Sequence, residues 1–299
     1  MSDAPVADRL RAAAAIAMVS ADALIEDLAD AGGGLTDAIA FTDADVETLG
    51  AEVTLPEDPW LARRAAQLAD GISPSKALSR AALARRGLIR AGFGIGTEQR
   101  SGRGLAGWSS SLSITGQATL DDDLAAATAI ALSPAARQAL SGRIRALTGD
   151  DPGPRPRILR TVIYGVDVLG HHTTVELGAP ATPTLIERLV EVAPAFELDA
   201  THLVALTSAH ALLRGEEPPW IRVPAIPERA VPGGTVTYGA QPAEIALRVV
   251  GILARTPEAI IRFGAWMDTL GASSVDSFEL VLGSPGHPLG TRIGVSIRA

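Results

Sequence analysis

The order of the elements predicted after residue 150 constrains the fold of this chain more than any other feature. Alternating polar and apolar residues over 158–177 predict a β-hairpin, interrupted at Gly170. Helices, short strands and a second hairpin are then expected in this order: helices 184–193 and 200–214, strands 221–223 and 235–238, helices 243–254 and 257–270, and a hairpin of 277–282 with 292–297. This order predicts an α+β fold with antiparallel hairpins, because a doubly wound sheet needs strict alternation of strand and helix.

The first half of the chain is expected to be mostly helical. Helix patterns cover 5–30, 60–69, 73–86, a segment starting near 119, and 133–147, whereas only 111–115 alternates as a strand does. The Gly-rich stretch 91–107 is expected to be a loop. Residues 149–156 are rich in Pro, Gly and Asp and are the predicted linker between a helical region, 1–148, and an α+β domain, 157–299.

Composition limits the chemistry and the location. The 299 residues are 47% hydrophobic and 20% charged, which is typical of a folded protein. The chain has no Cys, which excludes disulfides, thiolate nucleophiles and zinc fingers, and we expect no metal and no cofactor. No apolar run reaches the length of a membrane span, and the acidic N-terminus is unlike a signal peptide. These features favour a cytoplasmic, bacterial protein without a membrane partner.

Charge is strongly segregated along the first third of the chain. Residues 1–75 hold four Arg and fourteen Asp or Glu, a net charge of −10, whereas residues 76–105 have a net charge of +6. Six arginines of the basic segment are the predicted partner-binding residues: Arg80, Arg85, Arg86, Arg90, Arg100 and Arg103. Opposite patches of this kind favour association with a protein partner or with other copies of the chain.

The favoured hypothesis is therefore a non-enzymatic interaction or assembly protein, either self-associating or acting as an adaptor or chaperone. A nucleic-acid-binding regulator is a less favoured alternative. The basic helix followed by the Gly-rich stretch is similar to the recognition helix and wing of a winged-helix domain. Against it, the whole chain has a net charge of −8, and no aromatic stacking platform accompanies the arginines.

One short motif suggests an enzyme instead. Ser73-Pro74-Ser75-Lys76 has the S-x-x-K spacing, which resembles that of serine acyl-transferases related to penicillin-binding proteins. In that interpretation Ser73 is the nucleophile at a helix N-terminus, and Lys76 takes its proton. The later motifs of those enzymes are absent, since the chain has no Asn and no K-T-G near its end. In the alternative, purely structural interpretation, Ser73 is an N-cap residue and Lys76 is a solvated side chain.

The five histidines give weak signals. His171 and His172 sit at a predicted hairpin turn, where adjacent residues of a strand point to opposite faces and do not readily share one ion. His202 and His210 lie eight residues apart on one predicted helix, a spacing that does not form a metal face. We expect these two to be partly buried structural residues.

Overall fold

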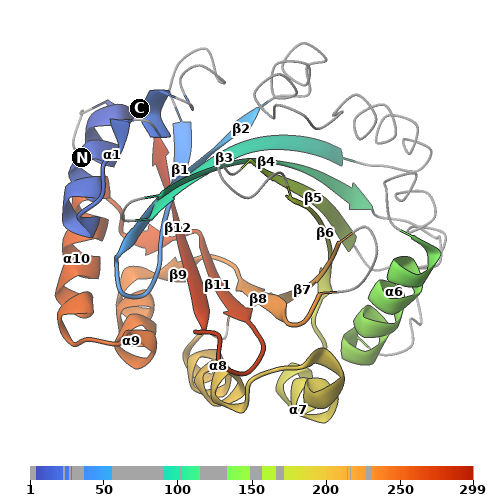
Figure 1. Ribbon diagram of the computed structural model, residues 1–299. Coiled ribbons are helices and arrows are strands. Elements are labelled where there is room, and N and C mark those ends of the chain that lie inside the picture. Colours follow the sequence, from blue (N-terminus) through green and yellow to red (C-terminus); the bar gives the residue numbers. More distant parts are fainter. Residues whose placement is uncertain are drawn as a thin grey trace.

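The described part of the chain forms a closed antiparallel barrel of ten strands with helices around its outside (Figure 1). In the computed structural model the described residues are 5–28 except 23 and 27, 37–55, 90–100, 103–114, 133–148, 157–165, 172–213, 215, 217–226 and 231–298. None of the helices within these ranges is long and apolar enough to cross a membrane.

The barrel strands, in chain order, are β1 (Asp37–Thr42), β2 (Thr48–Leu55), β3 (Arg90–Arg100), β4 (Arg103–Ile114), β5 (Arg157–Gly165), β6 (His172–Pro180), β7 (Trp220–Ala225), β8 (Gly234–Tyr238), β11 (Ser277–Leu282) and β12 (Gly290–Arg298). Around the barrel the order is β1-β12-β11-β8-β7-β6-β5-β4-β3-β2. The pairing of β1 with β2, in which Ala40 is opposite Ala51, completes the closure. A separate two-stranded sheet pairs β9 (Gln241–Pro242) with β10 (Ser274–Val275).

Strands from the two ends of the chain are neighbours. β1 runs antiparallel to β12, with Ala40 opposite Val295 and Phe41 opposite Gly294. Closure removes the free strand edges that an open sheet of this size exposes.

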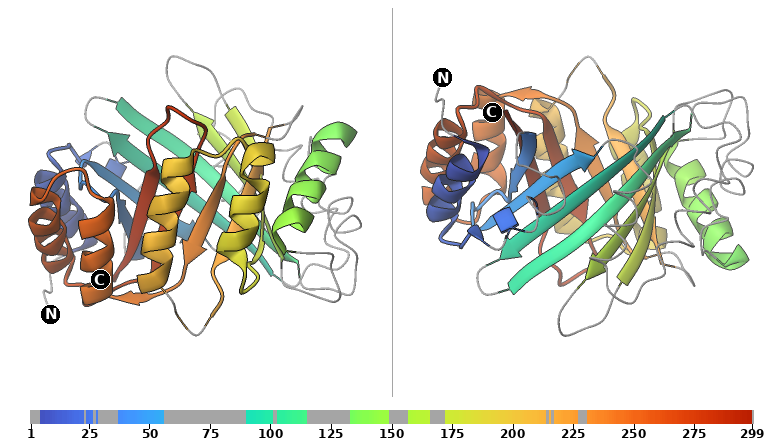
Figure 2. Two further views of the ribbon diagram at one scale, coloured as in Figure 1. Left: turned by 90° about the horizontal axis from the view of Figure 1, so that it is seen from below. Right: turned by 90° about the horizontal axis from the view of Figure 1, so that it is seen from above.

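The described helices lie on the outside of the barrel, and the core of buried apolar residues lies between them and the strands that they cover. They are α1 (Val6–Ala17), α6 (Pro134–Thr148), α7 (Leu185–Phe196), α8 (Ala200–Leu212), α9 (Ala243–Leu253) and α10 (Glu258–Leu270). Figure 1 looks along the barrel and shows them following one another outside the wall, from α1 and α10 round to α6. The side view in the left panel of Figure 2 shows several of these helices crossing the outside of the strands.

Local sequence explains where these helices begin and end. The carboxylate of Asp199 accepts a hydrogen bond from the backbone N–H of Thr201 and so caps α8. Ser133 caps α6 in the same way, through the N–H of Ala136. Helix α10 ends where Gly271 takes a left-handed conformation, with φ of 70°.

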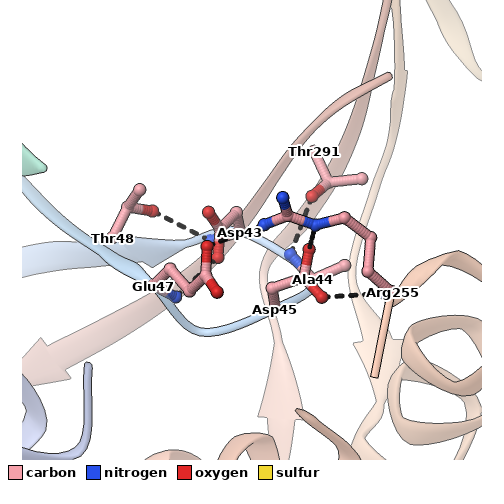
Figure 3. Close-up of polar contacts among 7 residues, drawn as sticks. All are labelled: Asp43, Ala44, Asp45, Glu47, Thr48, Arg255 and Thr291. Carbon is pink, nitrogen blue, oxygen red and sulfur yellow. Dashed lines mark hydrogen bonds and ion pairs between the residues drawn. The ribbon is translucent and has the colours of Figure 1, made fainter. Parts of the chain in front are cut away.

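The turn between β1 and β2 is tied to the end of α9 (Figure 3). The buried carboxylate of Asp45 accepts hydrogen bonds from the backbone N–H and the Nε of Arg255, at 2.8 and 2.7 Å. Glu47 binds Nη2 of the same guanidinium at 2.7 Å, and the N–H of Ala44 donates to Thr291 at 2.7 Å. Within the turn, Val46 is fully buried and has a φ of 54°, a conformation that β-branched residues rarely adopt. The surrounding contacts hold it there.

The structure confirms the predicted α+β class and its antiparallel hairpins, including β5 with β6 and β11 with β12. The first half contributes more strand than the sequence suggests, since β1 to β4 all precede residue 115. The prediction of a Gly-rich loop over 91–107 is wrong: this stretch lies mostly in β3 and β4, which pair along their length. The predicted linker, 149–156, does not divide the sheet, because β4 pairs with β5 across it.

Candidate functional site

Side chains alternate between two environments along the barrel strands. The hydroxyl of Tyr238 on β8 lies 2.8 Å from Nδ1 of His210 on α8, so this face of the strand points to the helices. Tyr238 pairs with Phe278, and Phe278 with Ile293, so the buried apolar residues of β11 and β12 share that outer face. The residues between them face the barrel interior.

Five charged side chains of the interior face form a continuous chain of ion pairs, which we call the interior ladder. From β2 to β6 around the wall its members are Glu52, Arg292, Glu279, Arg222 and Glu176. The pairs measure 3.3 Å between Arg292 Nη2 and Glu52, 3.8 Å between Arg292 Nη1 and Glu279, 2.8 Å between Arg222 Nη2 and Glu279, and 3.2 Å between Arg222 Nη1 and Glu176. The five groups carry a formal net charge of −1.

Glu279 is at the centre of the ladder. Its Oε2 atom faces the guanidinium groups of both Arg222 and Arg292. Only 11% of the Glu279 side chain is exposed, compared with 14% for Arg222 and 27% for Arg292. At this burial a lone charge loses much of its hydration, so the pairing keeps the charged residues compatible with the interior.

An aromatic ring supports one end of the ladder. The guanidinium carbon of Arg292 lies 3.4 Å from the ring centroid of Phe41, which is a cation–π contact. The ring lies against β12 at Gly294, where an added Cβ would come within 2.8 Å of Phe41 Cε1 and 2.6 Å of Ser277 Oγ. Gly294 is therefore required for the close approach of this ring, which in turn positions Arg292.

Small residues occupy the wall next to Glu52. Gly96 on β3 pairs with Glu52 on one side and with Gly107 of β4 on the other. Gly94 and Gly92 lie on the same face of β3, two and four residues away. Glycines contribute no side chain to this face of β3.

The residues singled out from the sequence do not form this site. Ser73, Lys76, Arg80, Arg85 and Arg86 lie outside the described residues. The other three predicted partner-binding residues, Arg90, Arg100 and Arg103, are at strand ends, and Arg100 pairs with Arg103 where β3 is followed by β4.

The helix histidines are structural, as expected. His202 is buried: its Nδ1 accepts the backbone N–H of Gly283 at 3.0 Å, and its Nε2 lies 3.0 Å from the carbonyl oxygen of His287. Since a carbonyl can only accept, the proton is on Nε2 and the ring is neutral. His210 binds Tyr238, whose burial raises the pKa of its hydroxyl. Across the described ranges, no three His, Asp or Glu side chains are grouped as metal ligands.

Sequence reasoning missed the ladder because its members come from five separate strands. The available signal was a charged residue at an alternating position of a strand that is otherwise apolar: Arg222 in WIRVPA, Glu279 in SFELVL and Arg292 in GTRIGV. One such residue is unremarkable, but three of them in strands of one sheet indicate a polar interior face.

Comparison with known proteins relates the chain to solved structures only. No family model and no curated protein matches it. Among solved structures 26 chains match, and one of them is the crystal structure of AnaPT from Neosartorya fischeri. The match covers 87% of this chain and 77% of that chain, with a TM-score of 0.52 and 10% sequence identity. At this identity the likeness concerns the fold, which this protein shares with AnaPT over most of its length.

Proposed function

We propose that this protein binds a prenyl diphosphate inside the barrel and transfers the prenyl group to a small acceptor. The observation that carries the proposal is the pair of interior arginines, Arg222 and Arg292, which converge on one oxygen of Glu279. Guanidinium groups bind phosphate oxygens in a bidentate fashion, and a partly buried pair binds them more strongly than a surface pair does. AnaPT, which has a similar fold, is a prenyltransferase. This likeness favours prenyl transfer over other reactions of diphosphates, although a fold alone does not determine chemistry.

The bonds and charges of the proposed reaction balance. The bond between the prenyl C1 and the diphosphate oxygen breaks, and its electron pair leaves with the diphosphate. A nucleophilic atom of the acceptor forms a new bond to C1, and the acceptor loses a proton to a carboxylate. In this scheme Arg222 and Arg292 stabilise the leaving diphosphate, and a glutamate of the ladder takes the proton. The products are the prenylated acceptor, diphosphate and one proton.

The interior also offers an apolar surface for the prenyl chain. Val281 lies two residues after Glu279 on the same face of β11 and is 42% exposed. The glycine positions of β3 face the same interior. An exposed aliphatic side chain beside paired charges is the combination that a ligand with an apolar tail and an anionic head needs.

The test is a transfer assay with radiolabelled dimethylallyl or geranyl diphosphate and a panel of aromatic acceptors. Arg222→Gln and Arg292→Gln should each lower the affinity for the prenyl diphosphate at least about tenfold, since each loses a charge-assisted contact. The control is Arg248→Gln, because Arg248 makes an exposed pair with Glu244 on α9, outside the barrel. The proposal fails if the wild-type protein neither binds a prenyl diphosphate nor transfers the prenyl group.

A second candidate function is assembly through charged surfaces. It is favoured by the charge difference between residues 1–75 and 76–105, and by the pairing of Arg100 with Arg103 where β3 is followed by β4. Light scattering after size exclusion, at low and high salt, tests it. A large species that dissociates in high salt supports assembly, and a monomer at both salt concentrations contradicts it.

The remaining hypotheses from the sequence each have a direct test. Acyl transfer by Ser73 and Lys76 predicts labelling by a fluorophosphonate probe that is lost in Ser73→Ala. Nucleic-acid binding predicts a salt-dependent affinity for DNA that is lost when Arg85, Arg86 and Arg90 are neutralised. The expected cytoplasmic location is tested by fractionation of cells that express the chain.

A further inference from the structure

We propose that Glu279 occupies the place of the anionic group of the ligand, so that binding displaces its carboxylate from Arg222 and Arg292. This inference rests on the proposed function and adds to it a residue that controls affinity. The ladder is asymmetric in how its glutamates meet the arginines. Among the described ion pairs, Glu176 lies against Arg222 and Glu52 against Arg292, whereas Glu279 Oε2 faces both guanidinium groups.

Two arginines that face one oxygen atom define a position where any anionic oxygen is stabilised twice. Glu279 fills that position at 2.8 Å from Arg222 and 3.8 Å from Arg292. A phosphate oxygen needs the same donors, and it carries more charge and more acceptor sites than a carboxylate does. The ligand and Glu279 therefore compete for one pair of donors.

The outer glutamates keep the arginines in place during such an exchange. Glu176 holds Nη1 of Arg222, and Glu52 holds Nη2 of Arg292, so each guanidinium presents its other Nη to the centre. The ring of Phe41 also packs against the guanidinium group of Arg292. The two donors thus stay oriented when Glu279 leaves, which lowers the cost of ordering the site around a ligand.

The charges of the ladder predict whether the loss of Glu279 strengthens or weakens the binding of an anion. With Glu279 ionised the five groups carry a net charge of −1, and with a neutral residue there the ladder is balanced. Removal of one negative charge next to an incoming anion removes a repulsion that is large in a partly buried site. Glu279→Gln should therefore bind inorganic pyrophosphate more tightly than the wild-type protein does.

The experiment measures pyrophosphate binding by calorimetry for the full chain and four variants. We expect Glu279→Gln to bind roughly tenfold or more tightly, and Arg222→Gln and Arg292→Gln to bind more weakly. The matched control is Glu52→Gln, which removes the same charge from a residue that pairs with Arg292 but does not lie between the two arginines of the ladder, and which should tighten binding less. Equal effects of Glu279→Gln and Glu52→Gln, or weaker binding to Glu279→Gln, would overturn the inference.

A measurement on the wild-type protein tests displacement without a variant. A carbodiimide and an amine label accessible carboxylates, and peptide mass spectrometry locates the label. Saturating pyrophosphate should increase the labelling of Glu279 and leave that of Glu244, which is exposed on α9, unchanged. If pyrophosphate binds and the labelling of Glu279 does not rise, the carboxylate is not displaced and the inference is wrong.

The two proposals can fail separately. If wild-type protein transfers a prenyl group but Glu279→Gln does not tighten pyrophosphate binding, the proposed function stands and the role of Glu279 falls. If pyrophosphate binds as described but no prenyl diphosphate is bound or turned over, the role of Glu279 stands for another anionic ligand.

Discussion

Arg255 and Asp45 are 210 positions apart in the chain, and two hydrogen bonds join them. One comes from the backbone N–H of Arg255 and the other from its Nε, and each reaches a different carboxylate oxygen (Figure 3). The pairing with Asp45 and Glu47 raises the pKa of Arg255 above its usual value. A helix end in the last third of the chain thereby fixes the first turn of the barrel.

Loss of this contact should destabilise the fold. Arg255→Gln leaves the buried carboxylate of Asp45 with its backbone partner but without the charged one, and we expect a loss of about 1–2 kcal/mol in the free energy of unfolding. The value is at the low end for a buried partner because Arg255 itself is 67% exposed. Urea denaturation measures it, with Arg248→Gln as the control. If the two variants lose the same small amount, the contact contributes no more than a surface pair does.

Gly294→Ala should disturb the interior through the ring of Phe41. The new Cβ would clash with Phe41 and Ser277, and overpacking of this kind costs about 1–3 kcal/mol. Because the ring supports Arg292, the variant should also bind pyrophosphate more weakly. The control is Gly142→Ala in α6, where an added Cβ meets nothing within 4 Å. That control should raise stability by about 0.5–1 kcal/mol, since alanine is the better helix residue.

His202 should contribute to stability through its ring, and His287 only through its backbone. His202→Ala removes the acceptor for the Gly283 N–H and leaves a small cavity, with an expected cost of about 2–3 kcal/mol. His287→Ala keeps the carbonyl oxygen that His202 binds, so its unfolding midpoint in urea should stay close to that of the wild type. A comparable loss in both variants would show that the His287 side chain matters as well.

Asp199 should make part of the free energy of unfolding depend on pH in the acidic range. Its hydrogen bonds with Thr201 lower the pKa of its carboxyl in the folded protein. The folded state thus favours the charged form, and this contribution is complete above the ordinary Asp pKa of about 3.9 and is lost as the pH falls through the lower folded value. Asp199→Asn keeps an N-cap acceptor but does not titrate. The difference in melting temperature between wild type and variant should be constant from pH 7 to 5 and should change below pH 4. A difference that is the same from pH 7 to 2 contradicts this assignment.

The second half of the fold could be predicted from sequence because its strands and helices have clear periodicity. Strands β11 and β12 and helices α9 and α10 lie within a few residues of the predicted ranges. β1 and β2 were missed because their buried positions are filled by small residues such as Ala38, Ala40 and Ala51, which have little strand propensity. The acidic residues around them resembled a solvated segment.

β3 was missed for a different physical reason. Glycines at 92, 94 and 96 suggested a loop, since glycine weakens a strand when nothing compensates. Their spacing of two is also the period of a strand, and here both edges of β3 are paired with long neighbours. The interior ladder could not be predicted, because its residues meet only when the barrel closes.

The pairing of β1 with β12 has a consequence for how the protein is made. The seam joins residues near position 40 to residues near position 295, so it has one of the largest sequence separations in the fold. On the ribosome the wall stays open until β12 has emerged, and the edges of β1 and β11 remain unpaired until then. Non-local pairing of this kind folds slowly. The two ion pairs of Arg292, which β12 carries, therefore form in the final step of folding, after synthesis of β12.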